Sequence, residues 1–179
     1  MFEADALNFQ AAGIQVGADT SQAEERLLSE ALSPFNVTSR NQALEMARLY
    51  AVLHCFENAV RTLIRETLEE KEGADWAEKL PKKVKDFADN RQKTAFEDSW
   101  LEGNKSDLLG FVEFGHLSLI IIDKWALFES IVPSQHWLKQ RMDELEKVRN
   151  FIAHNRMLLP SEFQRVYLYI ADWNKSVGL

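Results

Sequence analysis

A long stretch of apolar residues at helical spacing constrains the fold more than any other feature of the sequence. These residues recur mostly at intervals of three and four, which places them on one face of a helix packed against other helices. They are Leu49, Val52, Leu53, Phe56, Val60, Leu63, Ile64 and Leu68. Ser39 and Gln42 resemble a capping box at the start of this helix, and Gly73, which tolerates positive φ, follows its expected end near Lys71. We therefore expect a helix over residues 39–71.

The rest of the chain also favours helices. Only 7 Gly and 4 Pro occur in 179 residues, and no alternating apolar run is bounded by turns, so no strand is expected. The pattern is least regular over residues 76–104. Further helices are expected over residues 21–32, over residues 116–132, from the N-cap Ser134 to about Ile152, and over residues 161–176 with Ser161 as the N-cap. The predicted fold is all-α: an up-and-down helical bundle with a short N-terminal helical extension.

Charge is distributed unevenly along the chain. The 21 basic and 28 acidic residues give a formal net charge of -7, which argues against coating of nucleic acid or an anionic membrane through overall charge. Residues 1–30 contain six acidic residues and one basic residue, a net charge of -5, so the remainder carries only -2. We predict an acidic N-terminal extension with a short helix at 1–35 and a helical bundle at 36–179. Residues 1–19 are expected to form a tail or a helix on the bundle edge.

The cysteine content and the N-terminus bear on the compartment. Cys55 is the only cysteine, which excludes an intramolecular disulfide and a metal site built from two thiolates, and fits a reducing compartment. The N-terminal segment has no basic region, and the longest apolar run, residues 117–122, is interrupted by Ser118. We expect a cytoplasmic protein without membrane contact.

The stretch RNFIAHNR, residues 149–156, is the most informative about function. It places a permanent cation, an amide and a titratable imidazole within two helical turns. Asn150 and His154 are four apart and share a helical face, so the amide could fix the tautomer and orientation of the imidazole. Arg149 and His154 lie about 140° apart on an ideal helix, so they converge only through the long arginine side chain or at a helix end. The segment from Met157 to Pro160 favours a helix end there.

This motif resembles that of the HEPN domains (higher eukaryotes and prokaryotes nucleotide-binding), which is Arg, four to six residues, then His, often with Asn directly after the Arg. The resemblance extends over roughly residues 40–179. This region is similar to HEPN domains of bacterial toxin and defence proteins. It is carried by FENAVR, WAEKLPKKV, FVEFGHLSLII, DKWALFESIVP, RNFIAHNRML and RVYLYIADW. The resemblance implies a metal-independent endoribonuclease that dimerises, with the two motifs meeting across the interface.

The residues of the motif suit this chemistry. Cleavage of RNA by its own 2'-hydroxyl needs a base, an acid for the 5'-oxygen leaving group, and positive charge for the transition state. His154 would serve as base or acid, Arg149 would bind nonbridging phosphate oxygens, and Asn150 would orient His154. One motif has one histidine, so a second copy across a two-fold axis would provide the missing partner.

A polar stripe beside the apolar stripe supplies supporting residues. It contains His54, Glu57, Asn58, Arg61 and Arg65 at helical spacing, and Glu57 and Arg61 form an i,i+4 pair. Glu57 would hold Arg149 or Arg61 in place, and Arg156 would add positive charge. The structural alternative is a partly buried Glu57–Arg61 ion pair, with His154 as a helix cap and Arg149 paired with Glu146 or Glu57.

The bare Arg–His spacing also fits Arg48 and His54, with five residues between them. We favour the copy at Arg149 because Asn follows its Arg and a helix end follows its His. The first copy lies inside a long helix, where a structural role is expected for His54.

No carboxylate cluster suggests Mg²⁺, so no metal and no cofactor are expected. The expected partners are RNA, with tRNA as one candidate, a second copy of the chain, and an antitoxin or regulatory protein. The alternative function is a non-catalytic helical module that binds RNA, nucleotide or a protein partner.

Overall fold

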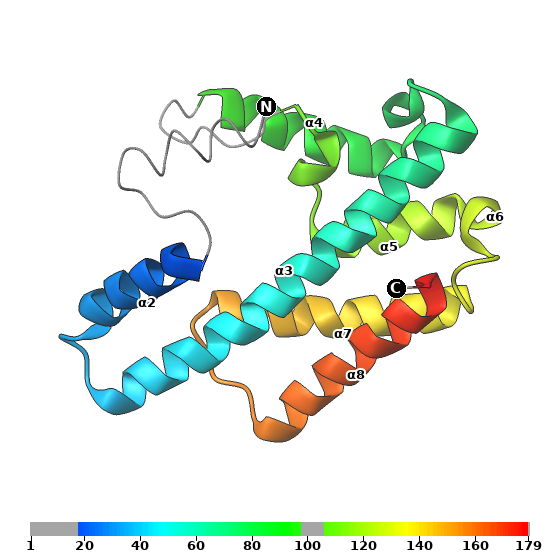
Figure 1. Ribbon diagram of the computed structural model, residues 1–179. Coiled ribbons are helices and arrows are strands. Elements are labelled where there is room, and N and C mark those ends of the chain that lie inside the picture. Colours follow the sequence, from blue (N-terminus) through cyan, green and yellow to red (C-terminus); the bar gives the residue numbers. More distant parts are fainter. Residues whose placement is uncertain (1–17, 98–105, 179) are drawn as a thin grey trace. The chain divides into compact units, whose positions relative to one another are not determined.

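The computed structural model describes residues 18–97 and 106–178, and within these ranges the chain is helical without strands (Figure 1). The all-α prediction is therefore confirmed. Residues 1–17, for which the sequence predicts a tail or an edge helix, lie outside the described residues. The elements are α2 (Ala18–Leu32), α3 (Val37–Glu72), η1 (Trp76–Lys79), α4 (Lys82–Glu97), η2 (Leu108–Phe111), α5 (Phe114–Asp123), α6 (Trp125–Phe128), α7 (Gln135–Ala153) and α8 (Pro160–Val177).

The chain divides into two compact units, Met1–Glu45 and Met46–Leu179, with the division inside α3. The boundary predicted after residue 35 stays a prediction. In the first unit, α2 matches the expected short helix. The Asn36 side-chain oxygen accepts a hydrogen bond from the Ser39 backbone N–H at 2.9 Å, so Asn36 caps α3 and the predicted capping role of Ser39 is wrong.

In the second unit, the predicted apolar stripe of α3 forms the centre of the core. Six of its residues are buried, namely Leu49, Leu53, Phe56, Val60, Ile64 and Leu68, whereas Val52 and Leu63 are partly buried. The helix ends as predicted, because Gly73 has a φ of +83° and its N–H donates to the carbonyl of Glu69 at 3.1 Å.

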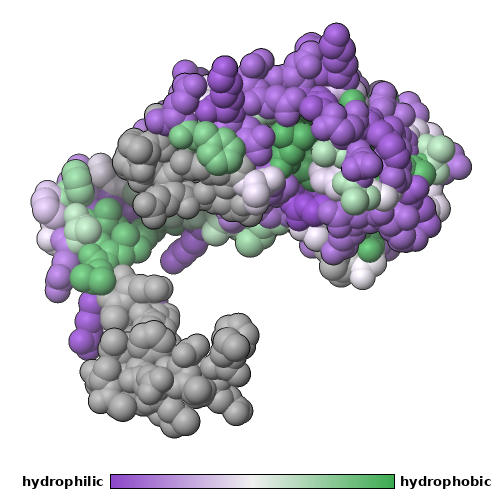
Figure 2. Space-filling view, turned by 90° about the horizontal axis from the view of Figure 1, so that it is seen from above, coloured by the Kyte–Doolittle hydropathy of each residue, from purple (hydrophilic) through white to green (hydrophobic). Residues whose placement is uncertain are grey.

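Aromatic and polar contacts join the helices of the second unit. The Phe56 ring on α3 packs against Phe114 at the start of α5, with ring centroids 6.0 Å apart, and against Trp173 of α8, at 5.6 Å. α5 packs along α7. The Tyr169 hydroxyl of α8 donates to Glu144 of α7 at 2.5 Å, which fixes these two neighbouring helices (Figure 1). Much of the surface visible in Figure 2 is hydrophilic, as expected for side chains outside this core.

The structure differs from the sequence analysis in three places. The helix expected over 116–132 is broken at Lys124, whose φ of -99° and ψ of 30° are not helical, and α6 already ends at Phe128. The Lys124 ammonium forms an ion pair with Glu72 at 3.0 Å. The least regular segment contains the helix α4, which buries only a narrow face through Val84 and Ala88. The last helix is capped by Leu159 and not Ser161, because Pro160 has no N–H to satisfy and suits the first helical position.

Candidate functional site

The RNFIAH motif lies at the C-terminal end of α7. The helix begins as predicted, since the Ser134 hydroxyl accepts a hydrogen bond from the Trp137 N–H at 3.1 Å. It ends at His154, and Asn155 has a left-handed φ of 57°. The N–H of Asn155 donates to Ile152 O at 2.8 Å and that of Arg156 to Phe151 O at 3.3 Å, which is the Schellman arrangement. The structure therefore has the predicted helix end at His154.

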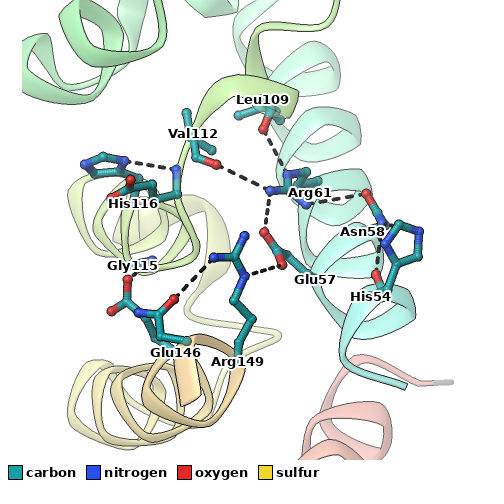
Figure 3. Close-up of polar contacts among 12 residues, drawn as sticks. His54, Glu57, Asn58, Arg61, Leu109, Val112, Gly115, His116, Glu146 and Arg149 are labelled. Atoms are coloured by element: carbon teal, nitrogen blue, oxygen red, sulfur yellow. Dashed lines mark hydrogen bonds and ion pairs between the residues drawn. The ribbon is translucent and has the colours of Figure 1, made fainter. Parts of the chain in front are cut away.

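Arg149 reaches from α7 towards a buried carboxylate on α3. Its Nε lies 4.0 Å from Oε2 of Glu57, and the other oxygen of Glu57 accepts from Nη2 of Arg61 at 2.5 Å. Figure 3 shows Glu57 between the two guanidinium groups. The Glu57 side chain is 11% exposed, whereas that of Arg149 is 42% exposed. Glu57 thus contacts both arginines that the sequence left as alternative partners.

The other proposed partner of Arg149, Glu146, is engaged elsewhere. Its carboxylate accepts a hydrogen bond from the Gly115 N–H at 3.2 Å, near the start of α5. A Cβ at position 115 would lie 2.9 Å from that carboxylate, so glycine permits the close approach. In the structure Glu57, and not Glu146, pairs with Arg149.

Arg61 connects α3 to the segment around η2. Its Nε donates to Leu109 O at 2.9 Å and its Nη2 donates to Val112 O at 3.3 Å, in addition to the Glu57 contact. Its side chain is 13% exposed. The geometry therefore gives Arg61 a bracing role for residues 109–112, close to the structural alternative considered from the sequence.

The imidazole of His154 is exposed at the helix end. Among the described residues, no group forms a hydrogen bond or an ion pair with its ring. The Asn150 side-chain oxygen accepts from Arg149 Nη1 at 3.2 Å, so Asn150 contacts the arginine of the motif and not, as expected, the histidine. The Arg156 guanidinium lies over the Phe151 ring at 5.4 Å from its centroid.

A polar cleft of about 410 Å³ lies along α3, and Arg149 of α7 contributes to its lining. Its lining combines three arginines, two carboxylates, an imidazole and an amide. The residues are Tyr50, His54, Glu57, Asn58, Arg61, Thr62, Arg65, Asp107, Gly110 and Arg149. His54, for which a structural role was expected, lines this cleft together with Arg149. The helical spacing of the polar stripe was the signal for this surface, but the sequence could not indicate that α7 contributes to it.

The other two histidines, His116 and His136, lie in the first turns of α5 and α7. His116 Nδ1 accepts a hydrogen bond from the Glu113 N–H at 3.2 Å, and its ring packs on Phe87 with centroids 4.6 Å apart. His136 is exposed in the first turn of α7. Neither residue lines the polar cleft.

A helical bundle whose long C-terminal region presents an Arg–Asn–x₃–His motif at a helix end is the arrangement expected of a HEPN domain. The family model described as Swt1-like HEPN matches residues 51–178. The chain belongs to this family, and the resemblance seen in the sequence is confirmed. No curated protein and no solved structure was found to match the chain.

Two properties hold for residues 18–97 and 106–178. No helix in these ranges has the length and apolar content needed to cross a membrane. No group of three or more His, Cys, Asp or Glu side chains in the same ranges is arranged to hold a metal ion.

Proposed function

We propose that this HEPN protein is a metal-independent endoribonuclease with a composite site across a homodimer. The proposal rests on the C-terminal end of α7. There the buried carboxylate of Glu57 pairs with Arg149, while His154 is exposed. In the proposed complex, the Arg149 guanidinium binds the nonbridging oxygens of the scissile phosphate. RNA, with tRNA as a candidate, is the substrate.

The reaction transfers two protons and exchanges one bond at phosphorus. A histidine accepts the proton of the 2'-hydroxyl as the 2'-oxygen attacks phosphorus. The bond from phosphorus to the 5'-oxygen breaks, and that oxygen receives a proton from a second acid. The products are a 2',3'-cyclic phosphate and a 5'-hydroxyl. The positive charge of Arg149 stabilises the negative charge that develops on the phosphate oxygens.

The dimer is proposed because a single chain separates its two motif side chains. Arg149 faces the polar cleft, while His154 projects into solvent without a protein partner among the described residues. A closed two-fold dimer would bring the partner subunit's His154 to the phosphate that Arg149 binds. An antitoxin or regulatory protein could control access to that interface, as expected of a toxin or defence protein.

The direct test is incubation of total RNA and tRNA with the purified protein in EDTA. We expect cleavage, products that end in 2',3'-cyclic phosphate, and loss of activity in Arg149→Ala and His154→Ala without unfolding. His136→Ala is the matched control, because this exposed histidine also lies on α7 but outside the motif. Activity that survives both motif substitutions would refute the proposal.

The composite site is tested by mixing the two inactive variants. Random reassociation makes about half of the dimers heterodimers, and each heterodimer has one intact Arg149–His154 pair out of two, so about a quarter of wild-type activity should return. No activity returns if the two residues act within one chain or if one reaction needs both His154 side chains of the dimer. Mixing the wild type with the Arg149→Ala/His154→Ala double variant separates these cases, because the activity per wild-type chain stays constant in the first case and falls in the second.

A non-catalytic HEPN module is the second candidate. It is favoured by the lack of any group that orients the His154 ring among the described residues. In that case the wild-type protein binds RNA, nucleotide or a protein without turnover, and the same EDTA assay shows uncleaved RNA.

A further inference from the structure

We propose that the polar cleft beside Arg149 binds a phosphate group of the RNA strand and that His54 is one of its hydrogen-bond donors. This inference rests on the proposed function for the source of the phosphate. It assigns to His54 a contact with the ligand, in place of the structural role expected from its position inside α3.

The hydrogen bonds of Asn58 determine how His54 is presented. The Asn58 amide nitrogen donates to the His54 carbonyl at 2.9 Å, and its oxygen accepts from Arg61 Nη1 at 3.4 Å, which together fix the orientation of the amide. The same amide nitrogen lies 3.2 Å from His54 Nε2. Since the amide nitrogen can only donate, Nε2 must accept, and the neutral ring then carries its proton on Nδ1.

The Nδ1–H group is therefore a positioned donor. Among the described residues no protein acceptor bonds it, and the Tyr50 ring lies on one side of the imidazole with centroids 6.2 Å apart. Figure 3 shows His54 and Asn58 on the helix that also carries Glu57 and Arg61, with Glu57 between His54 and Arg149. An imidazole held in one tautomer with a free N–H suits a phosphate oxygen.

The charge of the cleft favours an anion. Three arginines and two carboxylates line it, a formal balance of +1 with His54 neutral. The carboxylates are already paired, since Glu57 contacts Arg61 and Asp107 forms an ion pair with Arg65. Of the three arginines that line the cleft, Arg149 has the most exposed side chain, 42% against 13% for Arg61 and 32% for Arg65. The most exposed of the three arginine side chains therefore lines the same cleft as His54.

The binding experiment uses a short fluorescent 2'-O-methyl oligoribonucleotide, which cannot be cleaved. Anisotropy would measure its dissociation constant for the wild type, His54→Ala, Arg149→Ala and the control His136→Ala over a range of salt concentrations. We expect His54→Ala to bind about tenfold more weakly, the loss of one hydrogen bond to a charged group. His54→Gln, whose amide can donate, should recover part of this loss, and His136→Ala should bind as the wild type does.

The salt dependence separates a neutral donor from a cation. The slope of log K against log salt concentration is negative, and loss of one cationic contact to a single strand makes it shallower by about 0.7. We expect that change for Arg149→Ala, whereas His54→Ala should keep the wild-type slope. If His54→Ala made the slope as shallow as Arg149→Ala does, the assignment of a neutral donor would be overturned.

Histidine NMR signals of the wild-type protein provide a test that needs no variant to fold. Added oligonucleotide should shift the His54 ring signals and leave those of His136 in place. An unmoved His54 signal, or unchanged affinity in His54→Ala, would overturn the proposal. Tighter binding of a mononucleotide or inorganic phosphate than of the strand would also overturn it, because the ligand would then be a free phosphate compound.

These outcomes are distinguishable from failure of the proposed nuclease. If no RNA is cleaved but oligonucleotide binding depends on His54, the phosphate site stands and the nuclease falls. If RNA is cleaved and His54→Ala changes neither kcat, KM nor binding, the nuclease stands and the phosphate site falls.

Discussion

Replacing Glu57 with glutamine perturbs the carboxylate that both site arginines share while keeping the side-chain shape. The Arg61 contact is short and both side chains are largely buried, 13% and 11% exposed, so it should contribute about 1.5–3 kcal/mol, as for a hydrogen bond between charged groups. The Arg149 contact is 4.0 Å long and the arginine is 42% exposed, so screening limits its contribution to about 1 kcal/mol at most. Glutamine keeps one oxygen for Arg61, and we expect a net loss of about 2 kcal/mol.

Urea unfolding measures this loss as a lower midpoint with an unchanged slope. Glu70→Gln is the matched control, because Glu70 pairs with Lys71 on the same helix but is 70% exposed, and its change should stay within about 0.5 kcal/mol. If Glu57→Gln unfolds at the same urea concentration as Glu70→Gln, the carboxylate does not stabilise the site and the reasoning fails. RNA cleavage by Glu57→Gln should also fall, since Arg149 loses the group that positions it.

Three further predictions concern stability. Arg61→Lys should lower the free energy of unfolding by about 2 kcal/mol and speed hydrogen exchange around η2. The single lysine nitrogen cannot replace both Nε, which bonds Leu109 O, and Nη2, which bonds Glu57 and Val112 O. Asn155→Ala should cost about 1 kcal/mol in thermal unfolding, whereas Asn155→Gly should cost nothing, since φ is 57°. The hydrogen bond to Glu144 raises the pKa of Tyr169. This bond therefore stabilises the folded state fully below about pH 10, and the stabilisation is lost as the pH rises through the folded-state pKa. The free energy of unfolding of Tyr169→Phe should not show that loss at alkaline pH.

The core of the fold was predictable because one periodic pattern is long and unambiguous. The stripe between Leu49 and Leu68 needs only helical geometry to be interpreted. Helix boundaries were less predictable where two capping residues compete. Asn36 and Ser39 are both good N-caps, and the choice depends on which side chain meets the free N–H groups. α4 was missed because its buried face is narrow, so its charged residues mask the period.

The site was predictable where its partners are close in sequence. Glu57 and Arg61 lie one turn apart, and helix geometry alone brings them together. The partner of Arg149 depends on tertiary structure. Glu146 accepts a hydrogen bond from the N–H of Gly115, and Glu57 on α3 is the carboxylate that pairs with Arg149. The presence of His54 and Arg149 in the lining of one cleft depends on tertiary structure, since the two residues lie on different helices, and no local pattern describes it.

The two motif side chains differ in how far one chain organises them. Glu57 and Asn150 contact the Arg149 guanidinium, so its position is set within the protomer. Among the described residues nothing restrains the His154 ring, and the Schellman turn fixes only the backbone from which it projects. A phosphate held at Arg149 would thus find its proton donor or acceptor unpositioned in an isolated chain. A second chain that packs against this helix end would remove that freedom, so catalytic activity should appear with the dimer and scale with its concentration.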